Sequence, residues 1–366
     1  MELFNMILEK GINLGASDIH LAPGSVPVYR VDRKLYFDDS KLPMTGEFLE
    51  NLIIDFAKIT KNLEKIFEES KQVDFSHTYA GFRFRINLSL TKGLPNFSIR
   101  LIPNGEIDTT ETGVKELIAR LKKVNSGLIL ITGKVNSGKS TTLNAFIQEL
   151  NKEANKKIVT IEDPIEYVHT SNKCVIIQKE VGIEADVTSY YDGLINLLRE
   201  DADISVLGEI RDRKTMDVAL DLAEAGGLVI GTMHTRSCGE TIERIINLYD
   251  SADQMAVKNT LSNILKLVIS QKLLNNLNGG LILAPEIMVV TTTLAAQIRQ
   301  EKFKISEIED SIHSLRIAGC KSYEVSLSEL YVAHKIDMKT IKLVIEEDKL
   351  DSIKGLIVNA GGTLED

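Results

Sequence analysis

The sequence predicts an α/β fold that is organised around a parallel β-sheet. An uninterrupted apolar run over residues 128–132 leads into a glycine-framed loop and then into an amphipathic helical pattern over residues 139–150. Three more short apolar runs, over residues 157–161, 204–207 and 228–230, each end in polar residues. Continuous apolar strands of this kind are typical of parallel sheets that are buried on both faces.

The loop after the first run has the spacing of a phosphate-binding loop. Residues 133–140, GKVNSGKS, match the pattern G-x-x-x-x-G-K-[ST]. Its glycines let backbone N–H groups approach phosphate oxygens, and the following helix points its positive end at the anion. Lys139 is expected to neutralise the β- and γ-phosphates, and the Ser140 hydroxyl to reach Mg²⁺. The predicted nucleotide-binding residues of this loop are Gly133, Asn136, Ser137, Gly138, Lys139, Ser140 and Thr141. The alternative is a glycine-rich turn without a ligand.

Acidic residues and a histidine follow the other three runs. Glu162 and Asp163 follow the second run, Glu209 follows the third, and His234 follows the fourth. Because the carboxyl ends of parallel strands meet at one edge of a sheet, these side chains should lie beside the phosphate loop. A carboxylate in that place can hold a metal-bound water or orient an attacking water. Structural alternatives stay open: Asp163 or Glu209 as the cap of a following helix, and His234 as a purely structural histidine.

Residues 1–103 are predicted to form a smaller α/β module of their own. Apolar and polar side chains alternate over residues 82–91, which predicts a strand with one buried face, and residues 96–102 continue as another strand. Three arginines, Arg83, Arg85 and Arg100, lie on these two strands. They are either solvated surface charges or groups that reach the γ-phosphate of a nucleotide, since arginine makes bidentate phosphate contacts.

The composition and the termini exclude several other classes of protein. The formal net charge of −9 argues against broad binding of nucleic acid or of anionic membranes. The three cysteines lie far apart without a C-x-x-C, so neither a disulfide framework nor a cysteine zinc site is expected, and a reducing compartment fits best. The first residues, MELFNMILEKG, predict an amphipathic helix and not a signal peptide. We expect no direct membrane insertion, and any membrane contact should run through a partner.

These motifs resemble the family of secretion and pilus ATPases, and within it the type IV pilus retraction motors. The resemblance covers nearly the whole chain, in the family's order. It rests on SDIHL at residues 17–21, TIEDPIEY at residues 160–167 (the Asp box), LREDADISVLGEIRD at residues 198–212 (the Walker B segment) and AEAGGLVIGTMHT at residues 223–235 (the His box). The sequence lacks the four-cysteine zinc insertion that many assembly and secretion ATPases carry, which favours the retraction branch.

The resemblance implies a RecA-like P-loop NTPase core at residues 114–290. It places a PAS-like N-terminal domain at residues 1–103, a linker at residues 104–113 and a C-terminal helical region at residues 291–366. It further implies ATP and Mg²⁺ as cofactors, a homo-hexameric ring, and a cytoplasmic location at the inner face of the cell membrane. An inner-membrane pilus platform protein is the implied partner, with an opposing assembly ATPase as a further one.

The family's residue roles map onto this sequence one by one. They make Glu162 the base, Glu209 a group that binds Mg²⁺ and its water, and His234 a sensor of the γ-phosphate. Ser140 is expected to bind Mg²⁺ and Lys139 to bind phosphate. Arg85 and Arg100 are the expected phosphate-contacting arginines, and Arg83 is a further candidate. The implied function is ATP-driven pilus retraction in twitching motility. The alternatives are a pilus-assembly or type II secretion ATPase and a low-turnover nucleotide-binding regulator.

The sequence departs from the family pattern at several positions. Lys134, Val135 and Asn136 replace the usual Pro-Thr-Gly of the phosphate loop, and Gly227 stands where the first histidine of the His box is common. Asparagine tolerates a positive φ, so the loop is still expected to close. Residues 296–300, AQIRQ, echo a C-terminal motif of the retraction motors only loosely. We expect these departures to affect the rate of ATP turnover more than the binding of the nucleotide.

Overall fold

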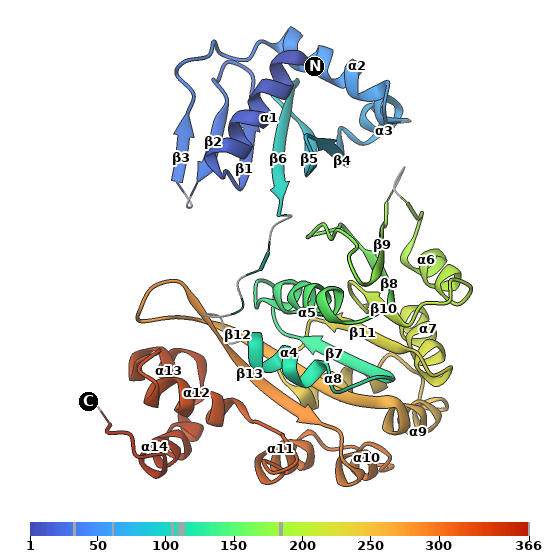
Figure 1. Ribbon diagram of the computed structural model, residues 1–366, viewed down its shortest axis with the longest axis vertical. Coiled ribbons are helices and arrows are strands. Elements are labelled where there is room, and N and C mark those ends of the chain that lie inside the picture. Colours follow the sequence, from blue (N-terminus) through green and yellow to red (C-terminus); the bar gives the residue numbers. More distant parts are fainter. Residues whose placement is uncertain are drawn as a thin grey trace. The chain divides into compact units, whose positions relative to one another are not determined.

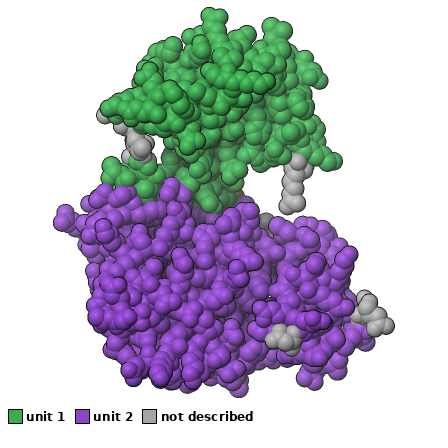
Figure 2. Space-filling model, turned by 180° about the vertical axis from the view of Figure 1, so that it is seen from behind, with its two compact units in different colours: residues 1–105, 164–169, 180–188 green, residues 106–163, 170–179, 189–366 purple. Residues whose placement is uncertain are grey.

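The computed structural model describes residues 1–31, 34–60, 62–103, 106–107, 109, 114–182 and 186–364. The chain divides into two compact units (Figure 2). Unit 1 comprises Met1–Gly105, Pro164–His169 and Glu180–Thr188, and unit 2 comprises Glu106–Asp163, Thr170–Lys179 and Ser189–Asp366. The predicted linker, residues 104–113, lies for the most part outside the described residues.

Unit 1 is a six-stranded antiparallel sheet with three helices packed on one face (Figure 1). Its strand order is β3-β2-β1-β6-β5-β4. The elements are α1 (Glu2–Leu14), β1 (Asp18–Leu21), β2 (Val28–Val31), β3 (Lys34–Phe37), α2 (Gly46–Ala57), α3 (Leu63–Ser70), β4 (Gln72–Tyr79), β5 (Phe82–Thr91) and β6 (Leu94–Ile102). The alternation predicted for β5 is confirmed, because Phe84, Ile86 and Leu88 are buried in the apolar core with α1 and α2.

Unit 2 is built on a seven-stranded sheet in the order β13-β12-β7-β11-β10-β8-β9 (Figure 1). Its strands are β7 (Gly127–Thr132), β8 (Lys157–Glu162), β9 (Val175–Glu180), β10 (Ile204–Leu207), β11 (Leu228–Met233), β12 (Leu265–Asn275) and β13 (Leu281–Val289). The last residue of β9, Glu180, belongs to unit 1. Strands β8, β10, β11, β7 and β12 run parallel, whereas β13 pairs antiparallel with β12. The four strands predicted from apolar runs are all present, and β11 extends three residues further than expected, to Met233.

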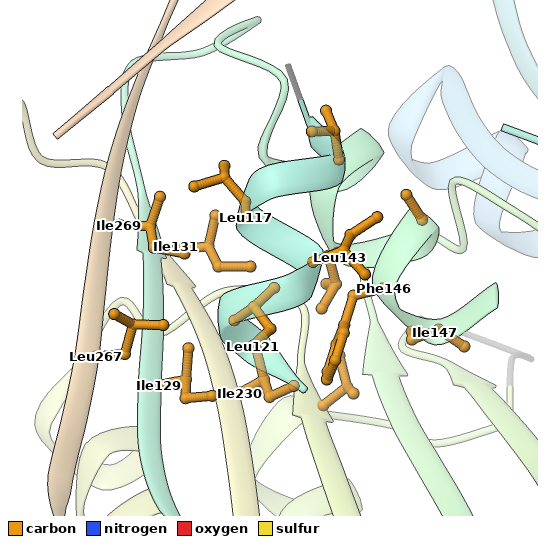
Figure 3. Close-up of a cluster of buried hydrophobic side chains, with 14 of the residues drawn as sticks. Leu117, Leu121, Ile129, Ile131, Leu143, Phe146, Ile147, Ile230, Leu267 and Ile269 are labelled. Carbon is orange, nitrogen blue, oxygen red and sulfur yellow. The ribbon is translucent and has the colours of Figure 1, made fainter. Parts of the chain in front are cut away.

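The core of unit 2 forms where two helices cover this sheet. Helices α4 (Val114–Leu121) and α5 (Lys139–Glu153) flank β7 in the sequence. Leu117, Leu143 and Phe146 of these helices point toward Ile129 and Ile131 of β7 (Figure 3). All six residues of β7 are buried, which anchors the loop that follows this strand.

The helices over residues 323–359 pack on the β12–β13 hairpin and form a second apolar cluster of unit 2. The remaining helices are α6 (Tyr190–Leu197), α7 (Arg213–Glu224), α8 (Cys238–Ile246), α9 (Gln254–Ile264), α10 (Thr292–Ile298), α11 (Ile305–Ser314), α12 (Tyr323–Val332), α13 (Met338–Val344) and α14 (Leu350–Asn359). Leu274 and Ile282 of the hairpin contact a cluster that includes Leu327, Ile341 and Ile353. The domain boundary at residue 290 stays a prediction.

A buried carboxylate ties this hairpin to the start of α8. Glu286 on β13 is 5% exposed, and its Oε2 accepts a hydrogen bond from the Cys238 N–H at 2.6 Å. Burial raises the pKa of Glu286 to about 7 from its ordinary 4.5. The hydrogen bonds from Cys238 oppose this shift, whereas the negative charges of Glu309 and Glu324 add to it.

The raised pKa of Glu286 predicts a pH-dependent stability. Between pH 4.5 and 7 the folded protein holds this proton and the unfolded chain does not, so the resulting stabilisation is complete below 4.5 and is lost as the pH rises through 7. This difference in pKa corresponds to about 3 kcal/mol. The free energy of unfolding of Glu286→Gln relative to wild type should therefore rise by roughly 2–3 kcal/mol from pH 5 to pH 8. Urea denaturation of both proteins at pH 5 and pH 8 measures this difference. The prediction is contradicted if the free energies of unfolding of the two proteins change with pH by the same amount.

Candidate nucleotide-binding site

Three residues with positive φ shape the loop between β7 and α5. The φ angles are 147° at Gly133, 61° at Asn136 and 86° at Gly138. A Cβ on Gly133 would lie 2.3 Å from Ser137 Oγ and 2.6 Å from the carbonyl oxygen of Gln271, so only glycine fits there. The positive φ of Asn136 agrees with the expectation that the altered loop still closes.

Lys139 is held inside this loop. Its Nζ donates hydrogen bonds to the carbonyl oxygens of Gly133 at 2.9 Å and Lys134 at 3.0 Å, and the residue is 8% exposed. Ser140 and Thr141 follow in the first turn of α5, whose N-terminal end favours an anion. The predicted role of this ammonium group at the β- and γ-phosphates stays a prediction.

A chain of side chains links Lys139 to the acid that follows β10. His234 Nδ1 lies 3.5 Å from Lys139 Nζ, and His234 Nε2 lies 3.4 Å from Glu209 Oε1. Glu209 Oε2 accepts a hydrogen bond from Arg211 Nη2 at 2.6 Å. The structure thus brings together three of the predicted site residues, from α5, from the end of β11 and from the end of β10.

Glu209 is held in its charged form. Burial alone would raise the pKa of its carboxyl group. The hydrogen bond from Arg211 and the electrostatic interactions with His234, Arg211 and Lys139 outweigh burial, so the pKa lies below its ordinary value. The group is therefore a carboxylate at neutral pH, and carboxylate oxygens are ligands that Mg²⁺ prefers.

Glu162 lies at the same edge of the sheet as Glu209. It is the last residue of β8, is 8% exposed, and accepts hydrogen bonds on Oε1 from Thr160 Oγ1 at 2.6 Å and Gln178 Nε2 at 3.1 Å. Strands β8 and β10 are neighbours, with Ile161 opposite Leu207. The alternative of Asp163 as a helix cap is wrong, because no helix begins there among the described residues 164–169.

The predicted arginines lie on the sheet of unit 1, on the face away from its apolar core. Arg85 and Arg100 are register partners on β5 and β6. Arg100 Nε donates to Asp18 Oδ1 at 3.1 Å, whereas Arg85 Nη2 lies 3.7 Å from Asp74 Oδ2. These side chains are 65% and 40% exposed, so both arginines can exchange their partners for phosphate. Their role at a nucleotide stays a prediction.

Arg83 has a different environment from the other two arginines. Its Nη2 lies 3.1 Å from Oε2 of the buried Glu180. Glu180 also accepts hydrogen bonds from the Ile165 N–H at 3.1 Å and from Ser76 Oγ at 2.6 Å. The ion pair and these hydrogen bonds therefore fix the second half of the Asp box within unit 1, which favours a structural role for Arg83.

Several residues that support the site were not predicted from the sequence. Arg211 follows Glu209 by two positions, yet its pairing depends on side-chain geometry that no spacing predicts. Gln178 lies on β9 and Gln271 on β12, two strands that were not predicted. Gln271 is buried and donates through Nε2 to Thr142 Oγ1 at 2.7 Å, so it supports the first turns of α5.

Comparison with known proteins assigns the chain to a family. Residues 1–280 match the model of a family described as "Type II/IV secretion system protein". The chain belongs to the type II/IV secretion system family. It is 37% identical over 320 residues to the type IV pilus retraction ATPase PilT of Pseudomonas aeruginosa, which covers 86% of this chain and 90% of that protein. It is also 34% identical over 289 residues to a twitching motility protein of Neisseria gonorrhoeae, covering 78% of this chain and 76% of the relative.

A solved structure extends the family likeness to three dimensions. The crystal structure of the pilus retraction motor PilT with bound ADP matches 95% of this chain and 98% of its own, with a TM-score of 0.83 and 34% identity. The predicted membership of the secretion and pilus ATPases is confirmed by these findings. So is the predicted fold class, a RecA-like P-loop core with an N-terminal PAS-like α/β domain and C-terminal helices. Within the described part of the chain, no helix of this family member is long and apolar enough to cross a bilayer.

Proposed function

We propose that this protein is an ATPase that turns ATP hydrolysis into the force for type IV pilus retraction. The proposal rests on one observation. The side chains of Lys139, His234 and Glu209 contact one another in series at the edge of the sheet where the parallel strands end. The proteins that it resembles over most of its length include a pilus retraction ATPase and a twitching motility protein.

The phosphate loop binds the triphosphate in this proposal. Backbone N–H groups of residues 134–141 and the N-terminal end of α5 bind the phosphate oxygens. Lys139 exchanges its carbonyl partners in the loop for the β- and γ-phosphates. Arg85 and Arg100 of the N-terminal domain add phosphate contacts, for which their exposed guanidinium groups are suited.

Residues at the strand ends carry the hydrolysis step. Glu162 accepts a proton from water while the water oxygen bonds to the γ-phosphorus and the bond from that phosphorus to the bridging oxygen breaks. The products are ADP and phosphate. His234, between Lys139 and Glu209, senses the γ-phosphate and the negative charge that is released with it.

The oxygen ligands present suit Mg²⁺. Ser140 offers a hydroxyl in the first turn of α5, and Glu209 offers a carboxylate that is ionised at neutral pH. Mg²⁺ bound there would neutralise charge on the β- and γ-phosphates. Arg211 orients Glu209 through the 2.6 Å hydrogen bond.

The order of segments along the chain suggests how a structural change on hydrolysis is transmitted from unit 2 to unit 1. The chain passes from unit 2 into unit 1 between Asp163 and Pro164, one residue after Glu162. Because Glu180 holds Ile165 to strands of unit 1, a displacement of Glu162 is carried into that unit. We propose a homo-hexameric ring of such subunits in the cytoplasm. It acts on a platform protein at the inner face of the membrane, against an opposing assembly ATPase.

Phosphate release by the purified protein tests the enzymatic part. Multiple turnovers with ATP are expected, whereas a nucleotide-binding regulator would bind ATP without turning it over. Deleting the gene in its host tests the direction of force. More pili without surface movement are expected for a retraction motor, and loss of all pili would instead indicate an assembly ATPase.

A further inference from the structure

Tyr190, the first residue of α6, places its hydroxyl directly beside Gly208. A Cβ built on Gly208 would lie 2.6 Å from Tyr190 Oη, 3.0 Å from the carbonyl oxygen of Ile161 and 3.2 Å from Glu162 Cα. The hydroxyl therefore occupies the space that the side chain of any residue other than glycine would fill. Gly208 keeps this space open for the tyrosine.

This location is between the two strand ends that carry the acids of the site. Gly208 immediately precedes Glu209, and its N–H donates to the carbonyl oxygen of Ile161 at 2.8 Å, one residue before Glu162. Glu162, Asp163, Glu209 and Arg211 are charged groups that are close enough to act on the phenol. The hydroxyl thus lies at the edge of the sheet where the proposed function needs a water molecule.

The phenol stays protonated in this environment. Burial raises the pKa of Tyr190 well above its ordinary value, and the negative charges of Asp163, Glu162 and Glu209 raise it further. Within the described part of the chain, no hydrogen bond engages this hydroxyl. An O–H donor without a protein acceptor, next to the predicted general base, is available to a water molecule.

We propose that Tyr190 is a further residue of the hydrolysis site, whose hydroxyl donates a hydrogen bond to the attacking water. The inference rests on the proposed ATPase function and adds to it a residue that the Asp box and the Walker B segment do not contain. The water gives one proton to Glu162 and accepts the Tyr190 hydrogen bond on one lone pair, so its second lone pair is directed at phosphorus. Tyr190 orients the water and takes no proton itself.

The test compares Tyr190→Phe with Tyr191→Phe in the full-length protein. Tyr191 is the matched control, because it is the next residue of α6 and is 45% exposed. The centroid of its ring lies 5.9 Å from Lys214 Nζ. We expect kcat of Tyr190→Phe to fall about tenfold, the loss that one hydrogen bond in the transition state implies. The KM for ATP and the Tm should stay at their wild-type values, and Tyr191→Phe should match wild type in all three.

Single-turnover hydrolysis, with protein in excess over ATP, separates the chemical step from product release. A tenfold slower single turnover of Tyr190→Phe supports the proposal. An unchanged rate overturns it, and so does a slower rate that comes with a raised KM or a lowered Tm, since a packing role produces that pattern. A wild-type protein without turnover would instead refute the ATPase function itself, which is a separate outcome.

Discussion

Replacing Lys139 with alanine is expected to lower ATP hydrolysis by roughly two to three orders of magnitude, the effect of removing one charge-stabilising group from a phosphoryl-transfer site. Lys139 is the cation that the loop holds within 3.0 Å of two of its own carbonyl oxygens and 3.5 Å from His234. Without it, the β- and γ-phosphates lose the group that neutralises their charge, so binding of ATP should weaken as well. Phosphate release and titration with a fluorescent ATP analogue measure the two effects.

Lys134→Ala is the matched control for this substitution. Lys134 belongs to the same loop but has an exposed side chain, and only its backbone carbonyl contacts Lys139. Its replacement should leave hydrolysis within about threefold of wild type, as for an exposed charge. Activity of Lys139→Ala at the level of Lys134→Ala would show that the loop is not the site of the triphosphate.

Replacing Glu209 with glutamine is expected to stop hydrolysis while ATP still binds. The amide has nearly the shape of the carboxylate but lacks the charge that Arg211, His234 and Lys139 stabilise. Because the phosphate loop is untouched, the affinity for the fluorescent ATP analogue should stay within a few-fold of wild type. Phosphate release should drop by roughly 10²–10³. Arg211 is 61% exposed, so it can be solvated once its partner is neutral, and the Tm should change little.

Glu224→Gln removes the same charge at a distance from the proposed site. Glu224 is an exposed residue at the end of α7. This variant should hydrolyse ATP at the wild-type rate. Undiminished phosphate release from Glu209→Gln would remove the role assigned to Glu209, and loss of analogue binding would show that the acid contributes to affinity and not to chemistry.

The strands that the sequence predicted best are those buried on both faces. The runs that became β7, β8, β10 and β11 are apolar because each strand is covered on both sides, and that cause acts locally in the sequence. Strands β12 and β13 were not predicted. Lys266, Gln271 and Lys272 interrupt the apolar pattern of β12, since its two faces meet different neighbours along its length. All four residues of β3 are exposed, so that strand has no alternation to detect.

The part of the candidate site that follows from the positions of the strand ends was predictable from the sequence. Lys139, Glu209 and His234 come together because parallel strands deliver their carboxyl ends to one edge, a rule that needs no side-chain detail. The position of the Tyr190 hydroxyl was not predictable. Tyr190 is the first residue of α6, lies far from Gly208 in the sequence, and contacts Gly208 only because of the way α6 packs. The contact between Arg83 and Glu180 is likewise a long-range pairing within unit 1 that no local pattern contains.

In the proposed function, a triphosphate lies between the loop of Lys139 and the acids at the strand ends. An experimental structure with Mg²⁺ and a non-hydrolysable ATP analogue tests it most directly. We expect a γ-phosphate in hydrogen-bond contact with Lys139 Nζ, His234 beside it, and a water molecule between that phosphate and Glu162. An empty loop, or a bound analogue whose γ-phosphate is out of reach of Glu162 and Glu209 even through one water, would contradict it.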